Sequence, residues 1–133
     1  MKHLWSIICN RLIIDEQTNN ATIIDILEEI KIKKEFLQNR KELPFFFNFV
    51  SLWFVEDKDE HEKETNVIIE FYDPNNNKLN DFNFSFALPQ RKKRIRTNVK
   101  FDRFILNGSG TYRIKVKQDN TEVAEIPLEI III

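Results

Sequence analysis

Several residue types are scarce in this 133-residue chain, and each scarcity excludes a class of protein. Cys9 is the only cysteine, so an intramolecular disulfide is excluded and a thiolate metal site is not expected. No apolar run approaches the roughly 20 residues of a membrane-spanning helix, the terminal run 130–133 included. The first apolar run ends at Asn10 and Arg11 before any cleavage site, so no signal peptide is expected. We expect a cytoplasmic protein without a membrane span.

Groups suited to catalysis or metal binding are also few. There are two histidines: His3 near the N-terminus, and His61 in the acidic stretch 56–64, which we interpret as a solvated loop rather than a metal site. Cys9 lies in an apolar segment with no basic residue placed to lower its pKa, so a buried structural thiol is expected. We therefore predict a protein that is not an enzyme and binds no cofactor or metal ion.

Glycine occurs only twice, at Gly108 and Gly110. A phosphate-binding loop requires a helix N-terminus behind its glycines, where aligned backbone amides meet the anion. An alternating strand over residues 112–116 follows these glycines instead. The sequence therefore predicts a tight turn here.

Phenylalanine, by contrast, is abundant, with twelve residues, and apolar residues alternate with polar ones along much of the chain. Phe82, Phe84, Phe86 and Leu88 share one side of a predicted strand, which is the pattern of a half-buried strand. The same pattern predicts about eight strands, near residues 4–14, 21–32, 44–55, 66–72, 79–88, 94–101, 110–117 and 122–131. Strands of this length and spacing predict an all-β fold, an antiparallel β-sandwich forming one domain over residues 1–133.

One segment departs from the alternation. Residues 33–43 contain good helix formers, and Phe36 and Leu43 lie seven residues apart on one helical face. The segment is either a short helix or a polar crossover between the sheets, and the sequence leaves both open.

Residues 106–116 read Leu-Asn-Gly-Ser-Gly-Thr-Tyr-Arg-Ile-Lys-Val. This segment resembles the tyrosine-corner region of fibronectin type III and related sandwiches, in which a leucine lies six residues before a tyrosine that opens a strand. The resemblance implies that Leu106 and Tyr112 are structural, with the Tyr112 hydroxyl bonded to backbone a few residues upstream. Among immunoglobulin-, fibronectin- and C2-like sandwiches, the calcium sites of the C2 type are not carried over, because Asp57, Asp59 and Asp73 lack their flanking pattern.

A longer pattern covers more of the chain. Its parts, in order, are residues 8–16, 21–30, 71–75, 110–116 and 126–130. Together they resemble a bacterial family of small single-domain proteins catalogued as a domain of unknown function. The resemblance implies a β-sandwich and supplies no active site.

Charge is strongly polarised, although the net charge is only -1. Residues 90–117 hold ten basic residues and one acid, Asp102. If the strands near 94–101 and 110–117 lie in one sheet, alternation predicts a basic face made of Arg91, Lys92, Lys93, Arg94, Arg96, Lys100, Arg113, Lys115 and Lys117. Such a face can attract phosphates of nucleic acid or acidic lipid. It can equally prevent an exposed sheet edge from pairing with another strand, complement the charge of the acidic stretch 56–64, or orient a protein partner.

The strand near 44–55 is apolar on both faces. Phe45, Phe47, Phe49, Trp53 and Val55 share one side, and the opposite side carries Phe46, Val50, Leu52 and Phe54. Because an outer sheet face is normally polar, this second set needs cover, from residues 33–43 or from another chain. The terminal run 130–133 raises the same question, as a possible edge for an added strand.

These observations predict a noncatalytic interaction or structural module. It binds a protein partner, or another copy of itself, through the apolar face of Phe46, Val50, Leu52 and Phe54. The alternative is a binder of anionic surfaces, nucleic acid or acidic lipid, through the basic face of residues 91–117.

Overall fold

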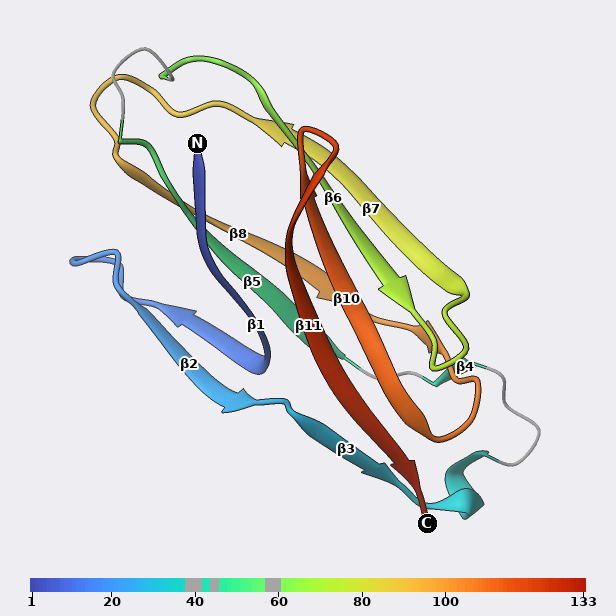
Figure 1. The fold of residues 1–133 in the computed structure, drawn as a ribbon. Coiled ribbons are helices and arrows are strands. Elements are labelled where there is room, and N and C mark those ends of the chain that lie inside the picture. The colour runs from blue at the N-terminus through green and yellow to red at the C-terminus, as the bar shows by residue number, and fades with distance from the viewer. Residues whose placement is uncertain (38–41, 44–45, 57–60) are drawn as a thin grey trace.

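The computed structural model describes residues 1–37, 42–43, 46–56 and 61–133. Their strands form two packed sheets and one short ladder (Figure 1). The four-stranded sheet has the order β2-β1-β5-β8, with β1 at Lys2–Ile14, β2 at Ala21–Ile26, β5 at Phe47–Phe54 and β8 at Arg94–Phe101. The five-stranded sheet has the order β3-β11-β10-β6-β7, with β3 at Glu29–Ile32, β6 at Thr65–Tyr72, β7 at Lys78–Phe86, β10 at Gly110–Gln118 and β11 at Thr121–Ile132. The ladder pairs β4 (Glu42–Leu43) with β9 (Phe104–Ile105). The predicted all-β sandwich is confirmed.

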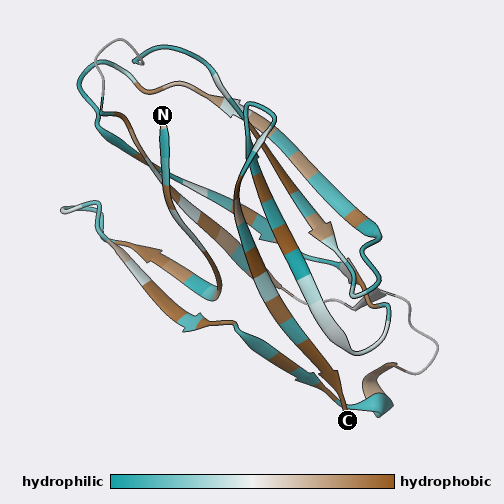
Figure 2. Ribbon diagram, in the orientation of Figure 1, coloured by the Kyte–Doolittle hydropathy of each residue, from teal (hydrophilic) through white to brown (hydrophobic). Residues whose placement is uncertain are grey.

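The core lies between the inner faces of the two sheets. Phe47 on β5 stacks on Phe101 of β8 at 4.6 Å between ring centroids, and Phe101 meets the edge of Phe82 from the opposite sheet at 4.9 Å. Figure 2 shows that apolar and polar residues alternate along β10 and its neighbours. One side of each strand is therefore buried while the other remains polar.

The predicted single strand over residues 21–32 is wrong, because the chain changes sheets within it. β2 pairs with β1, whereas β3 pairs with β11 in the other sheet, and in parallel. Asp25 takes a left-handed backbone conformation (φ 54°), and the Leu27 amide then donates to the carbonyl oxygen of Ile8 at 2.8 Å. The alternation is interrupted at this switch, where Ile26 and Leu27 are followed by Glu28 and Glu29, but such a break does not reveal that the next strand joins the other sheet.

Residues 33–43 are helical in part. Lys34–Leu37 form one turn of 3-10 helix (η1), and the Lys34 amide donates to the carbonyl oxygen of Ile133 at 2.9 Å. η1 therefore lies beside the end of β11, whereas β4 pairs with β9; residues 38–41 lie outside the described residues. No helix of the described chain has both the length and the hydropathy needed to cross a bilayer.

The tyrosine corner is confirmed. The Tyr112 side chain is fully buried, its hydroxyl donates to the carbonyl oxygen of Gly108 at 2.8 Å, and it accepts from the Asn107 amide at 2.7 Å. The Asn107 side chain in turn donates to Oδ2 of the buried Asp73 at 2.7 Å. The Asn77 amide, at 2.8 Å from Oδ1, is the main cause that lowers the pKa of Asp73. The corner thus joins the 107–110 turn to the turn after β6.

Candidate functional site

The predicted single basic face is wrong, because its two strands lie in different sheets. β8 is an edge strand of the four-stranded sheet, and β10 is a central strand of the five-stranded sheet. Alternation places the basic side chains on the outer face of each sheet, as predicted, but the outer faces of a sandwich point in opposite directions. Arg94, Arg96 and Lys100 are therefore separated from Arg113, Lys115 and Lys117.

The β10 group is neutralised by neighbouring strands. Lys117 Nζ lies 2.7 Å from Glu70 Oε1 on β6, and Arg113 Nε lies 2.9 Å from Glu125 Oε1 on β11. Lys115 Nζ lies 4.7 Å from the centre of the Tyr72 ring. The β10 cations thus find these partners within their own sheet, on β6 and β11.

Glu70 is the most buried member of this network, at 6% exposed. Besides Lys117, its carboxylate faces Lys78 Nζ at 3.7 Å, and Lys78 also pairs with Asp81 at 3.0 Å. The hydrogen bond from Lys117 is the main cause that lowers the pKa of Glu70, against an opposing effect of burial. On this face, the positive charges of Lys117 and Lys78 are therefore balanced by the nearby carboxylate of Glu70.

The cations at 91–100 differ from the β10 group. Within the described residues, none of Arg91, Lys92, Lys93, Arg94, Arg96 and Lys100 forms an ion pair. Arg96 instead donates through Nη2 to the carbonyl oxygen of Asn19 at 3.0 Å. His61, next to the undescribed residues 57–60, donates through Nε2 to the carbonyl oxygen of Lys92 at 2.9 Å. The outer face of the four-stranded sheet therefore keeps a cluster of cations without ion-pair partners in the described part of the chain.

The apolar face predicted on β5 is partly covered by the chain itself. Val50 is 0% exposed, so it is not available to a partner, and its place in the predicted binding face is wrong. Leu52 and Phe54 are half-buried, whereas Phe46 is 69% exposed. The strand β1 lies alongside, with Trp5 opposite Leu52 and Ile7 opposite Val50.

The strand β1 pairs with a different neighbouring strand along each half of its length. Its first part, Lys2 to Cys9, pairs with β5, and its second part, Cys9 to Ile14, pairs with β2. Figure 1 shows β1 turning sharply between these parts. The β1–β2 hairpin therefore reaches the outer face of β8, where its turn meets Arg96.

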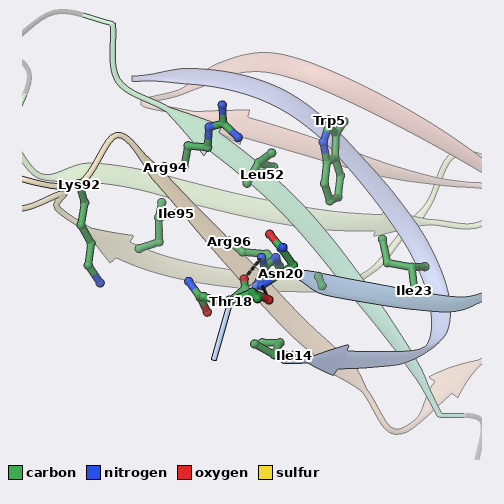
Figure 3. A pocket seen from close by; sticks show the side chains of 12 residues that line it. Trp5, Ile14, Thr18, Asn20, Ile23, Leu52, Lys92, Arg94, Ile95 and Arg96 are labelled. Carbon is green, nitrogen blue, oxygen red and sulfur yellow. Dashed lines mark hydrogen bonds between the residues drawn. The ribbon is translucent and has the colours of Figure 1, made fainter. Parts of the chain in front are cut away.

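Between the hairpin and the outer face lies a cavity of about 540 Å³, which we call the arginine hollow (Figure 3). Its apolar side includes Trp5, Ile14, Ile23 and Leu52, and its cationic side is formed by Lys92, Arg94 and Arg96. Thr18, Asn19 and Asn20 of the hairpin turn form a polar wall, and Ala21 and Ile95 also line the cavity. The volume falls in the range of small-ligand and anchor sites, and the lining combines apolar contact with cations that form no ion pair among the described residues.

A second cavity of about 410 Å³, the Phe46 hollow, lies on the same face and shares Ile14 with the first. Arg11, Phe46, Asn48 and Lys100 are among its lining residues. Lys100 is thus placed apart from Arg94 and Arg96 although it lies on the same face of β8.

A chain of hydrogen bonds at the N-terminal end of β1 was not predicted. His3 Nε2 lies 2.6 Å from the Ser6 hydroxyl, which lies 2.6 Å from the hydroxyl of the fully buried Ser51. Burial lowers the pKa of His3, which favours the neutral ring, and the tautomer decides whether Nε2 accepts from the Ser6 hydroxyl or donates to it. A neutral imidazole beside a hydroxyl is also the pairing that activates a serine. Because Ser51 holds the Ser6 hydroxyl from the other side, we interpret this chain as a means of satisfying buried polar groups.

Cys9 is buried, as expected, and burial raises the pKa of its thiol. Among the described residues, no three His, Cys, Asp or Glu side chains gather in a way that could hold a metal ion.

Sequence reasoning missed the hairpin residues of the arginine hollow. Alternation alone would place Trp5 on the outer face, since it lies two residues before Ile7 and opposite Leu52. Ile14, Asn19 and Asn20 have no such signal, because their position depends on the bend of β1. The turn residues Asp15 to Asn20 looked like an ordinary solvent-exposed connection.

Three comparisons with known proteins add to this description. The family model described as "Family of unknown function (DUF6941)" matches residues 4–131. A search of curated proteins finds no match. Among solved structures, the chain is similar to an immunoglobulin-like protein from Pseudomonas aeruginosa, with 14% identity and a TM-score of 0.43, covering 92% of this chain and 90% of that chain.

Proposed function

Since this chain belongs to the family of unknown function DUF6941, which brings no activity with it, we propose a function from the geometry of its surface. The protein is a noncatalytic binding module that holds a protein partner on the outer face of its four-stranded sheet. The observation that carries this proposal is the contrast between the two outer faces. The five-stranded sheet pairs Lys117 with Glu70 and Arg113 with Glu125 and holds Lys115 over the Tyr72 ring, whereas the four-stranded sheet keeps its cations beside a cavity.

The contact surface differs from the predicted set of Phe46, Val50, Leu52 and Phe54. With Val50 buried, the available apolar groups include the exposed Phe46 and Ile14 and the half-buried Leu52, Phe54 and Trp5. Apolar groups next to cations give both desolvated contact and orientation, a combination found at protein interfaces. Binding to nucleic acid or acidic lipid has less support, because the basic residues do not form one extended face.

Photo-crosslinking tests this proposal. Ile14, 47% exposed between the two cavities, is replaced by p-benzoylphenylalanine, and Val123 on β11, 36% exposed, receives the same replacement as a matched control. Irradiation in the native host should give a discrete protein adduct from position 14 and none from position 123. An adduct of twice the chain mass identifies a second copy as the partner. Adducts of equal yield from both positions would contradict the proposal.

A further inference from the structure

The arginine hollow also indicates what kind of partner segment it accepts, an inference that rests on the function proposed above. We propose that it binds a short acidic segment of a partner protein that inserts one aromatic or branched aliphatic side chain. Trp5, Ile23 and Leu52 contact the inserted side chain, and Arg94 and Lys92 face the flanking carboxylates.

The apolar part of the hollow supports a single anchor. Trp5 and Leu52 are cross-strand neighbours on β1 and β5, and Ile23 and Ile14 approach from the hairpin. A cavity of about 540 Å³ lined in this way holds one large side chain with its backbone. Anchors that fill such pockets contribute most of the binding free energy at protein interfaces.

The charged part supports carboxylates on either side of the anchor. Arg94 and Lys92 form no ion pair with any described residue, and Arg94 is exposed. A guanidinium group matches a carboxylate with two parallel hydrogen bonds. The Thr18, Asn19 and Asn20 wall offers further polar groups to a peptide backbone.

The shape of the hollow disfavours larger anions. The hairpin turn closes one side through the bond between Arg96 and Asn19, so the cations line a recess rather than an open stripe. A nucleic-acid duplex or a bilayer needs several cations on one accessible surface. A narrow acidic peptide can contact these cations from within the recess.

A titration with labelled peptides tests the inference. The probe is fluorescein-Asp-Glu-Phe-Glu-Asp, measured by anisotropy at low salt, with one control peptide carrying alanine for phenylalanine and another carrying Asn and Gln for the acids. We expect each control peptide to bind at least tenfold more weakly. In the protein, Arg94→Ser should weaken binding at least fivefold, whereas Lys100→Ser, the same change on the same strand but in the Phe46 hollow, should change it less than twofold. Trp5 fluorescence should change on binding, and Trp5→Phe should remove that signal.

The outcomes separate this inference from the proposed function. Equal losses for Arg94→Ser and Lys100→Ser would overturn it, since binding would then follow general charge. So would equal affinity for the neutral control peptide, or tighter binding of duplex DNA or of phosphatidylserine vesicles in parallel titrations. Absence of peptide binding together with a position-14 adduct would overturn the acidic-anchor inference and leave the proposed docking face standing.

Discussion

Arg96 on β8 donates through Nη2 to the carbonyl oxygen of Asn19, at 3.0 Å, and so joins the edge of the four-stranded sheet to the β1–β2 turn. The turn is also held from within, because Asp15 Oδ1 accepts from the amides of Gln17 and Thr18 at 2.8 and 2.9 Å. One wall of the arginine hollow is therefore tied to β8 by a hydrogen bond between two residues that are 77 positions apart in the sequence.

Removing that bond should loosen the hairpin turn. We expect Arg96→Ser to raise the hydrogen-exchange rate of the turn amides of Asp15 and Asn19 by about threefold, because an exposed bond of this kind contributes on the order of 0.5–1 kcal/mol. Lys100→Ser removes a cation from the same strand without a bond to the turn and should leave those rates unchanged. Equal exchange in both variants would show that Arg96 does not position the hairpin.

The tyrosine corner should contribute substantially to stability. Tyr112→Phe leaves the Asn107 amide and the Gly108 carbonyl without their partner, and we expect a loss of about 1–3 kcal/mol in the free energy of unfolding by urea. Tyr72→Phe is the control: it removes a hydroxyl that hydrogen-bonds Glu70, a carboxylate that keeps its cationic neighbours Lys117 and Lys78, and its ring still meets Lys115. Equal losses would contradict a special role for the corner.

The two glycines should respond differently to alanine. Both have positive φ angles, 86° at Gly108 and 145° at Gly110, but a Cβ at Gly110 would lie 2.8 Å from Pro74 Cγ, whereas at Gly108 nothing lies within 4 Å. We expect Gly108→Ala to cost about 1–2 kcal/mol from backbone strain alone, and Gly110→Ala to cost more because Pro74 must also shift. Thermal or urea unfolding measures the difference, and a smaller loss at Gly110 would refute the predicted contact.

Glu70 should make stability depend on pH. Its pKa is lowered in the folded protein, so the folded state favours its ionised form, and this contribution is complete above the ordinary value of 4.5. It is lost as the pH falls through the lowered folded value. Wild-type protein should therefore lose more stability between pH 6 and pH 3 than Glu70→Gln, measured by urea unfolding at each pH. A slope for Glu70→Gln identical to that of the wild-type protein would count against the network.

Much of the fold follows from alternation along the strands. Phe82, Phe84 and Phe86 were placed correctly, and the tyrosine corner was recognised because its leucine, turn and tyrosine lie within one short segment. Alternation reports which face a residue occupies and not which strand lies next to it. The sequence therefore predicted correctly that Arg94 and Lys115 each lie on an outer face, but it placed them wrongly on the same face.

The binding surface was harder to predict because it depends on long-range geometry. Val50 was expected at an interface but is fully buried, and no local pattern encodes the bend of β1 that brings the β1–β2 hairpin to β8. The neutralisation of Lys117 by Glu70 likewise depends on the pairing of β10 with β6 across about 45 residues. Such pairings are selected by the packing of the complete core rather than by any one segment.

The central claim is that partner binding uses the cations of the four-stranded sheet and not those of the five-stranded sheet. The most direct measurement is the yield of the position-14 photo-adduct in two charge-matched backgrounds, Lys92→Ser with Arg94→Ser, and Arg113→Ser with Lys115→Ser. Each background removes two positive charges, and circular dichroism checks that both remain folded. We predict that the first pair reduces the adduct at least fivefold and that the second leaves it within twofold of the parent. Equal reduction by both pairs, or a greater effect of the second, would contradict the account.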